Sequence, residues 1–451
     1  MRIMHLSDLH LGKRLNEFSM IEDQRFILRR ITGIAEEREV ETVIIAGDIY
    51  DKAVPSAEAV ELFDDFLVRL SEKGKKVFVI SGNHDSAERI AFGGRLMDRS
   101  GIYMSPVYNG SVEPVVLEDE HGRLCFYMLP FVKPGNVRRF FPEEEIESYT
   151  DAVRTAVDSM NIDDGDRNIL ITHQFVTGAT RSDSEDFSVG GSDNVDAAVF
   201  ALFDYVALGH IHRAQKCGSD YIRYSGTPLK YSFSEADDDK TVTIVDMGAK
   251  GDISLSFCPL KPKRDLVEIR GTYEELTLKS FYEGTSYQED YMHITLTDED
   301  DVPEALARLR VIYHNIMKLD YDNRRTRHSA EISGATEVSS KTPLQHFEDF
   351  FELQNGQPMK EEQREYVSAI IEEMWEGRQD ETIKAKNISV RPIRRRESFR
   401  LREAGDRRNL SDYRRYGRGQ NHDFRRDNLR AVRKSKRQQQ GGVDAPFQVC
   451  G

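Results

Sequence analysis

The chain has 451 residues, a length that suits two or three globular domains, and its formal net charge is −15. Its 4 cysteines lie far apart without a C-x-x-C pair, which excludes a disulfide-stapled domain and a zinc knuckle. No apolar run is long enough to span a membrane, and the first residues lack the apolar core of a signal peptide, so we expect a cytoplasmic protein.

The first ninety residues alternate predicted strands and helices. The stretches "RIMHLSDLH", "ETVIIAGDIYD" and "KVFVISGNHD" each begin as an apolar strand and end in a polar loop. Apolar residues at helical spacing occupy residues 20–39, and Ser56 is placed to N-cap a second helix that extends to about Lys73. This β-α-β-α-β order predicts a buried sheet flanked by helices.

Later segments continue the pattern and then change it. "NILITHQ" and "YVALGHIH" are two more strands that end in polar loops, and "KTVTIVDMG" and "DISLSFCPL" complete this body near residue 260. Residues 265–330 indicate a small α+β module with strands "DLVEIRG" and "YMHITLT" and a helix over residues 302–318. Residues 343–376 predict two helices separated at Asn355-Gly356.

Side chains that bind metal ions follow five of the predicted strands. Open α/β sheets place their sites at the carboxyl ends of strands, so these side chains should meet. Oxygen and imidazole ligands together suit Mn²⁺, with Fe²⁺ or Zn²⁺ as alternatives, and seven ligands suit two ions bridged by a carboxylate. His5, inside the first strand, is instead predicted to be a core histidine. The candidates are Asp8, His10, Asp48, Asn83, His84, His173, His210 and His212.

The spacing of these residues resembles that of the calcineurin-like metallophosphoesterases. "DLH", "GDIYD", "GNHD", "THQ" and "GHIH" stand in the order of that superfamily's motifs. The longer stretches "HLSDLHLGK", "IIAGDIYDKAVPS", "VISGNHDSAERI" and "YSGTPLKYSFSEA" resemble the bacterial SbcD family over about residues 1–376. The resemblance implies an α/β fold: a two-sheet metallophosphoesterase sandwich flanked by helices, with a small α+β capping domain and a C-terminal helix pair.

The resemblance also implies roles for the residues at the strand ends. It implies two ions, with Mn²⁺ as the expected metal. His84 would contact the scissile phosphate, Asp85 would orient His84, and Arg89 is a candidate phosphate contact or a surface ion pair. Asp51, where some relatives carry a second histidine, is expected beside the ligands or at a helix start. One ion would be held by Asp8, His10, Asp48 and His212, and the other by Asp48, Asn83, His173 and His210.

By the same resemblance, residues 1–262 would be the nuclease domain, 263–332 a DNA-facing capping domain, and 333–377 a helix pair that docks on the SbcC-type coiled-coil ATPase partner. The remaining residues, 378–451, form a basic tail. A homodimer would form through residues 56–73 and the stretch after Arg89.

The function implied is that of a nuclease subunit of an ATP-dependent SbcCD-type complex. It would act as a 3′–5′ exonuclease and a hairpin endonuclease in DNA repair, recombination and replication, at the nucleoid. Two alternatives remain: a small-molecule phosphodiesterase of the same superfamily, and a metal-free protein-binding scaffold.

The tail falls outside this resemblance. Residues 384–451 carry 20 Lys and Arg against 7 Asp and Glu, whereas residues 1–383 carry 43 against 71. The segment is expected to be disordered, and its charge suits an arm that grips DNA. We prefer a second hypothesis, out-of-frame translation that leaves the tail without a selected function. The codons of "DYRRYGRGQNHDF", read from the second base, can encode "ITGDTGAGKTTI", which contains the ATPase phosphate-loop motif G-x-x-x-x-G-K-T.

Overall fold

The computed structural model describes residues 1–185 and 193–323, with scattered positions between 344 and 368. The chain divides into two compact units, Met1–Ser340 and Lys341–Gly451, and the elements below belong to the first. Most of the predicted helix pair and all of the predicted tail lie outside the described residues. Within the described part of the chain, no helix has both the length and the apolar character needed to cross a membrane.

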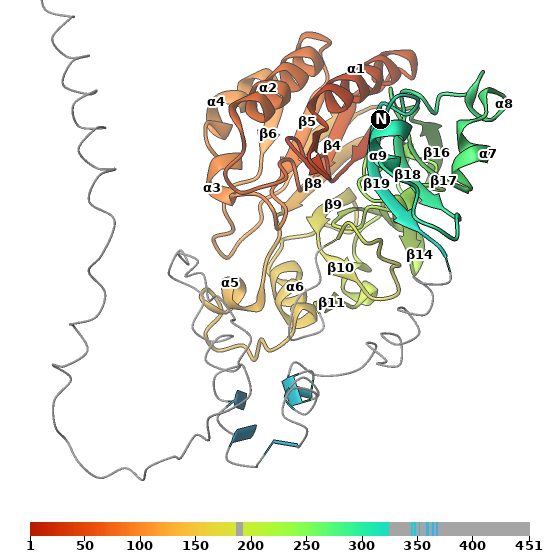
Figure 1. Ribbon diagram of the computed structural model, residues 1–451. Helices are drawn as coiled ribbons and strands as arrows, with labels where there is room; N and C mark the ends of the chain where they lie inside the picture. Colours follow the sequence, from red (N-terminus) through yellow and green to blue (C-terminus); the bar gives the residue numbers. More distant parts are fainter. Residues whose placement is uncertain are drawn as a thin grey trace, which may run out of the picture. The chain divides into compact units, whose positions relative to one another are not determined.

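A six-stranded sheet forms one half of the body, in the order β16-β15-β1-β4-β5-β6 (Figure 1). The strands from β1 to β6 in this order are parallel, whereas β15 is antiparallel to β1 and β16 to β15. Two long amphipathic helices cover its outer face, as predicted. The elements are β1 (Arg2–Leu6), α1 (Ile21–Glu37), β4 (Thr42–Ala46), α2 (Ala57–Glu72), β5 (Lys76–Ile80), β6 (Ile102–Met104), β15 (Thr241–Met247) and β16 (Ile253–Pro259).

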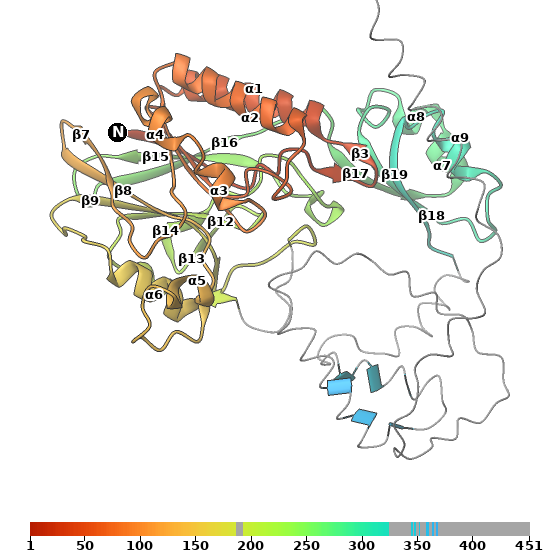
Figure 2. The same ribbon diagram turned by 90° about the vertical axis from the view of Figure 1, so that its left-hand side faces the viewer.

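A second six-stranded sheet has the order β13-β14-β12-β9-β8-β7. Its four central strands are parallel, and β7 and β13 are antiparallel to their neighbours. Its outer face packs against α5 and α6 (Figure 2). The elements are β7 (Val115–Asp119), β8 (Gly122–Leu129), α5 (Pro134–Arg138), α6 (Tyr149–Asp158), β9 (Arg167–His173), β12 (Tyr205–Gly209), β13 (Gln215–Cys217) and β14 (Ser219–Tyr224).

The two sheets pack face to face around an apolar core. Phe78 of the first sheet stacks on Phe126 of the second, with ring centroids 4.1 Å apart. His5 is fully buried, and its ring nitrogens lie 2.9 Å from the Tyr205 hydroxyl and 3.2 Å from the Leu208 carbonyl oxygen. The predicted two-sheet sandwich and the predicted core role of His5 are both confirmed.

The α2 helix begins as the sequence predicts. Ser56 has an extended backbone, and its hydroxyl accepts a hydrogen bond from the Ala59 N–H, which satisfies one orphan donor of the first turn. The remaining short elements of the body are β2 (Arg14–Leu15), β3 (Phe18–Ser19), α3 (Ala87–Ile90), α4 (Gly94–Met97), β10 (Phe175–Val176), β11 (Asn194–Val195) and the 3₁₀ helices Asp98–Ser100, Ala197–Phe200 and Phe233–Glu235.

The module after residue 264 is a three-stranded parallel sheet with short helices. The helix predicted over residues 302–318 is wrong beyond Leu309, because Asn315–Tyr321 forms the third strand. Ile316 pairs with Met292 and is buried in the module's own core, so strand pairing overrides the helical spacing. The elements are β17 (Leu266–Gly271), α7 (Tyr273–Thr277), α8 (Lys279–Tyr282), β18 (Tyr291–Leu296), α9 (Ala305–Leu309) and β19 (Asn315–Tyr321).

A buried ion pair ties this module to the first turn of α1. Asp23 is fully buried, and both of its oxygens accept hydrogen bonds from the Arg264 guanidinium, one of them at 3.0 Å. The Tyr291 hydroxyl donates to the same carboxylate at 2.8 Å. In Figure 2 the module lies beside β3 and this end of α1.

Candidate metal centre

The predicted ligands converge where the carboxyl ends of both sheets meet. The predicted ligands lie on the loops that follow β1, β4 and β5 of the first sheet and β12 of the second. His173 is the last residue of β9 in the second sheet. Six of the seven have at most 8% of their surface exposed, and Asn83 is half-buried. The structure brings together all of Asp8, His10, Asp48, Asn83, His173, His210 and His212, with His84 beside them.

Backbone geometry at these loops is unusual. Asp8, His10, Asp48 and His210 have φ values of 54°, 44°, 48° and 105°, the left-handed region that side chains other than glycine seldom adopt. Hydrogen bonds hold the loops in place: the Asp8 N–H donates to the Gly47 carbonyl and the His10 N–H to the Asp48 carbonyl, both at 3.0 Å. Such local strain clusters at functional sites, where the surroundings impose it.

Steric contacts explain why two positions of the sequence motifs are glycine. A Cβ at Gly82 would lie 2.1 Å from Oδ1 of Asp48, and a Cβ at Gly209 would lie 1.8 Å from the Ala46 carbonyl oxygen. Neither position tolerates a side chain unless the site moves. The close approach of these loops therefore requires the glycines that precede Asn83 and His210.

One group of ligand atoms gathers around His10 and His212. Their Nε2 atoms lie 3.1 Å apart, and Asp8 contributes a carboxylate oxygen within 4.8 Å of both rings' ligand atoms. His10 Nε2 is 3.7 Å from Oδ2 of Asp48. Two imidazoles and two carboxylates that face one another in a buried site are a donor set for a divalent cation.

A second group lies on the other side of Asp48. His173 Nε2 is 3.4 Å from Oδ2 of Asp48 and 3.0 Å from Oδ1 of Asn83. His210 Nδ1 is also 3.0 Å from the Asn83 oxygen. The same Asp48 oxygen thus lies near a histidine of each group, the position that a bridging ligand requires.

Burial and neighbouring charges shift the pKa values of these groups in different directions. Burial raises the pKa of Asp8 to about 8. Burial also opposes ionisation of Asp48, but the nearby His173 outweighs it and holds the pKa of Asp48 well below its usual value. Burial disfavours the His173 imidazolium, yet Asp48 raises its pKa to about 9. Divalent cations would take the place of these protons, because metal binding requires deprotonated ligands.

His84 lies at the open side of the site. Its backbone N–H donates to Oδ1 of Asp48 at 2.9 Å, and its ring Nδ1 lies 3.1 Å from the Asp51 carbonyl oxygen. Its Nε2 is 4.0 Å from Oδ2 of Asp48, and its side chain is 21% exposed. This ring is therefore placed to reach a group that approaches the ligands from solvent.

Asp85 supports the loops around His84. Its carboxylate accepts backbone hydrogen bonds from Ile49 and Tyr50, both at 3.0 Å, and from Gly82 at 2.9 Å. Burial raises the pKa of Asp85 to about 6. These bonds join the loop after β4 to the loop after β5, which carries His84.

Two further candidates have different surroundings. Asp51 lies 3.8 Å from His10 Nδ1 and receives a hydrogen bond from Lys13 at 2.9 Å, so it stands beside a ligand as expected. Arg89 is exposed on α3, where its backbone N–H is capped by Ser86.

The comparisons with known proteins give the family. Residues 1–214 match the model of the calcineurin-like phosphoesterases, and residues 262–355 match the model described as the type 5 capsule protein repressor C-terminal domain. The chain is 32% identical over 375 residues to the SbcD subunit of nuclease SbcCD from Staphylococcus epidermidis, and the match covers 82% of this chain and 98% of the relative. The chain belongs to the SbcD family.

Membership in the SbcD family, with a calcineurin-like phosphoesterase domain, makes the chain a metal-dependent hydrolase of phosphodiester bonds. Its clusters of histidine and aspartate indicate divalent cations as the cofactor. A solved dimetal phosphatase from Danio rerio is 10% identical, with a TM-score of 0.33, and the match covers 58% of this chain and 96% of that one.

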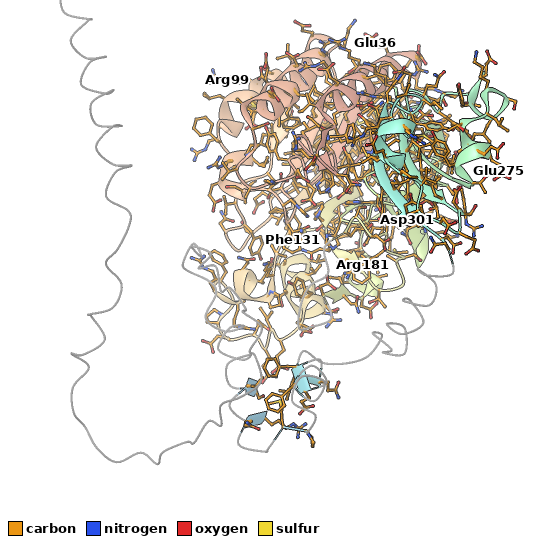
Figure 3. The ribbon with its side chains drawn as sticks, viewed as in Figure 1. Glu36, Arg99, Phe131, Arg181, Glu275 and Asp301 are labelled. Atoms are coloured by element: carbon orange, nitrogen blue, oxygen red, sulfur yellow. The ribbon has the colours of Figure 1, made fainter. Side chains whose placement is uncertain are left out.

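Aromatic rings line the His210 side of this SbcD-family site. Phe131 lies nearly parallel to the His210 ring with centroids 6.5 Å apart, and Phe175 is 6.4 Å from the same ring. The Arg181 guanidinium covers the Phe175 ring at 3.6 Å. Phe131 and Arg181 are labelled in Figure 3. Apolar and aromatic surface therefore lies beside His210 on this side of the site.

Sequence reasoning missed the residues that hold the ligands in place. The Gln24 side chain donates to the His10 carbonyl at 2.8 Å and accepts from the Gly12 N–H at 3.0 Å, and the Tyr231 hydroxyl donates to the Leu9 carbonyl at 2.6 Å. Tyr231 lies within "YSGTPLKYSFSEA", a stretch that resembles the SbcD family, so that signal could have found it. Gln24 carries no such signal.

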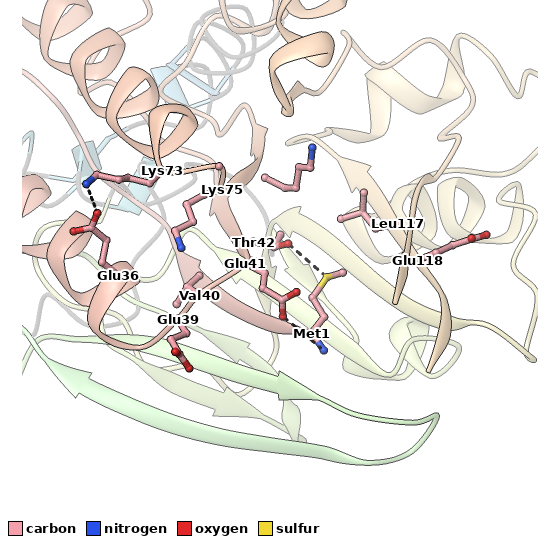
Figure 4. Close-up of a pocket in the computed structure, with 12 residues that line it drawn as sticks. Met1, Glu36, Glu39, Val40, Glu41, Thr42, Lys73, Lys75, Leu117 and Glu118 are labelled. Atoms are coloured by element: carbon pink, nitrogen blue, oxygen red, sulfur yellow. Dashed lines mark hydrogen bonds and ion pairs between the residues drawn. The ribbon is translucent and has the colours of Figure 1, made fainter. Parts of the chain in front are cut away.

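A cavity of about 600 Å³ lies away from this chemistry (Figure 4). Met1, Thr42 and Lys76 line it, so it opens at the amino ends of β1, β4 and β5, opposite to the ligands. Its rim mixes acidic and basic side chains, including an ion pair of 2.5 Å between Lys73 and Glu36. The cavity therefore plays no part in the metal centre.

Proposed function

We propose that the chain hydrolyses DNA phosphodiester bonds with two Mn²⁺ ions that share Asp48. The observation that supports this most strongly is the position of the Asp48 carboxylate, with Oδ2 3.7 Å from His10 Nε2 and 3.4 Å from His173 Nε2. Two ions joined in this way would clamp the attacking and leaving oxygens of an in-line displacement and activate a water molecule. Asp8 and His212 would complete one site, and Asn83 and His210 the other.

His84 would act on the substrate and not on the metal. This proposal is supported by the partial exposure of the side chain and by the contact of Nδ1 with the Asp51 carbonyl; Nε2 would contact the scissile phosphate or protonate the leaving 3′ oxygen. Asp85 would serve by holding the loop that carries it, and Arg89 would be a peripheral phosphate contact.

The proposed setting is a complex with an SbcC-type ATPase, as the name of the Staphylococcus epidermidis relative indicates for that protein. The enzyme would act as a 3′–5′ exonuclease and hairpin endonuclease on DNA at the nucleoid, in repair, recombination and replication. Residues 1–262 would form the nuclease domain, 263–332 the capping domain that selects DNA geometry, and 333–377 the helix pair that binds the ATPase. Residues 378–451 would be a tail without a selected function.

A homodimer would form through the surface around α2, α3 and α4. Phe92 and Leu96 are 82% and 80% exposed, and Val54 and Val60, at the start of α2, are 68% and 45% exposed. Large apolar side chains gathered at this edge of the first sheet suit an interface between two copies of the chain.

The test compares Mn²⁺-dependent cleavage of a labelled DNA duplex and of bis-p-nitrophenyl phosphate, with and without the ATPase partner. Cleavage of duplex DNA that requires Mn²⁺ and rises with the partner and ATP supports the proposal. Turnover of the small ester alone would favour a small-molecule phosphodiesterase, and absence of Mn²⁺ binding would favour a protein-binding scaffold.

A further inference from the structure

The Nδ1 atom of His212 contacts a series of hydrogen-bonded polar side chains that have no role in the chemistry above. Ser184 Oγ lies 2.5 Å from His212 Nδ1, and Oε1 of Glu235 lies 2.5 Å from the same hydroxyl. Ser184 and His212 lie on separate loops and Glu235 ends the 3₁₀ helix Phe233–Glu235, and Ser184 is 28 positions from His212 and 51 from Glu235 along the chain. Their contact is therefore a product of the fold and not of local sequence.

Glu235 is held in one place by its surroundings. It is fully buried, and Lys240 Nζ lies 2.6 Å from its Oε2. Lys240 also donates to the His212 carbonyl oxygen at 2.9 Å. A buried ion pair rarely adds much stability compared with apolar packing, so its use here calls for another reason.

The donor and the acceptor of each hydrogen bond in this series can be assigned. The Ser184 hydroxyl donates to Oε1 of Glu235, while the other oxygen of the same carboxylate accepts from Lys240. The Ser184 oxygen is then left to accept the proton on Nδ1 of His212. The Nε2 atom of His212 therefore carries the lone pair, and it faces His10 Nε2 at 3.1 Å.

We propose that Glu235 and Ser184 are positioning residues that fix His212 in the tautomer and orientation needed to bind a divalent cation. The proposal rests on the assignment of His212 as a ligand. Histidine ligands commonly donate their second ring N–H to an outer partner, and loss of that partner typically lowers metal affinity about 10- to 100-fold. Glu185 adds a second support, because its carboxylate accepts the His212 backbone N–H at 2.6 Å.

The experiment uses the full chain and titrates Mn²⁺ by calorimetry. Ser184→Ala removes the hydroxyl and leaves the Glu235–Lys240 pair in place. We expect one of two ions to bind about 10- to 100-fold more weakly while the other is unchanged. Ser184→Thr, which keeps the hydroxyl, should restore the affinity. Ser71→Ala, at a half-buried serine of α2 whose hydroxyl donates to the Ser100 carbonyl, should leave both ions unchanged.

A nuclear magnetic resonance measurement separates positioning from a general loss of structure. The ¹⁵N shifts of His212 in the metal-free protein should report a proton on Nδ1 in the parent chain and a mixture of tautomers in Ser184→Ala, with thermal unfolding little changed. Unchanged Mn²⁺ affinity and unchanged shifts in Ser184→Ala would overturn the inference alone. Unchanged Mn²⁺ binding in His212→Ala would overturn the ligand assignment itself, and the inference with it.

Discussion

The ion pair between Asp23 and Arg264 should carry much of the attachment of the three-stranded module to the nuclease body. Asp23 is fully buried and accepts hydrogen bonds from the Arg264 guanidinium and the Tyr291 hydroxyl. Of these two donors, Arg264→Ala leaves only the Tyr291 hydroxyl. Removing one partner of a buried ion pair costs about 3–5 kcal/mol. Because the Arg264 side chain is 23% exposed and partly screened by water, we expect the lower end, about 3 kcal/mol.

A matched control lies in the same module. Arg270 pairs with Asp322 on the surface, where its side chain is 60% exposed, so Arg270→Ala should cost less than about 1 kcal/mol. The free energy of unfolding of each variant is measured in urea, and hydrogen exchange at β17–β19 reports whether the loss is local. Equal destabilisation by the two substitutions, or none by Arg264→Ala, would refute the reasoning.

Three further predictions concern the site, the surface and the tail. His84→Gln should retain both Mn²⁺ ions in calorimetry while cleavage falls roughly 10²–10⁴-fold; loss of an ion would make His84 a ligand. Phe92→Glu should shift the chain towards monomer in sedimentation, whereas Val311→Glu, at a residue 77% exposed in the module of β17–β19, should not; dimers that persist in both would remove this surface from the interface. A chain that stops after Gly377 should keep Mn²⁺-dependent cleavage and ATPase binding, and a large loss of either would give the tail a function.

Much of the fold could be predicted because it depends on short-range pattern. Continuous apolar runs such as "KVFVI" indicate the strands of both sheets, and helical spacing with an N-capping Ser56 indicates α1 and α2. The convergence of the histidines and aspartates could also be predicted, since carboxyl ends of parallel strands share one edge. The core position of His5 follows from the same pattern, as it stands within a strand.

The rest depends on contacts between distant parts of the chain. Residues 310–318 have helical spacing, but pairing with β18 makes Asn315–Tyr321 a strand. The Gln24 side chain contacts the Tyr231 hydroxyl across 207 positions of sequence, and Ser184 contacts Glu235 across 51. No local sequence pattern predicts either contact. Left-handed backbone at Asp8 and Asp48 is equally hidden, because it is imposed by the hydrogen bonds between loops.

Calorimetric titration of Asp48→Ala with Mn²⁺ shows whether Asp48 joins two ions. In the parent chain the account predicts two bound ions, since Oδ2 of Asp48 lies within 3.7 Å of a histidine of each group. In Asp48→Ala both ions should bind much more weakly and DNA cleavage should disappear, whereas His10→Ala and His210→Ala should each weaken one ion. Two ions bound by Asp48→Ala with parental affinity would contradict the bridged metal centre.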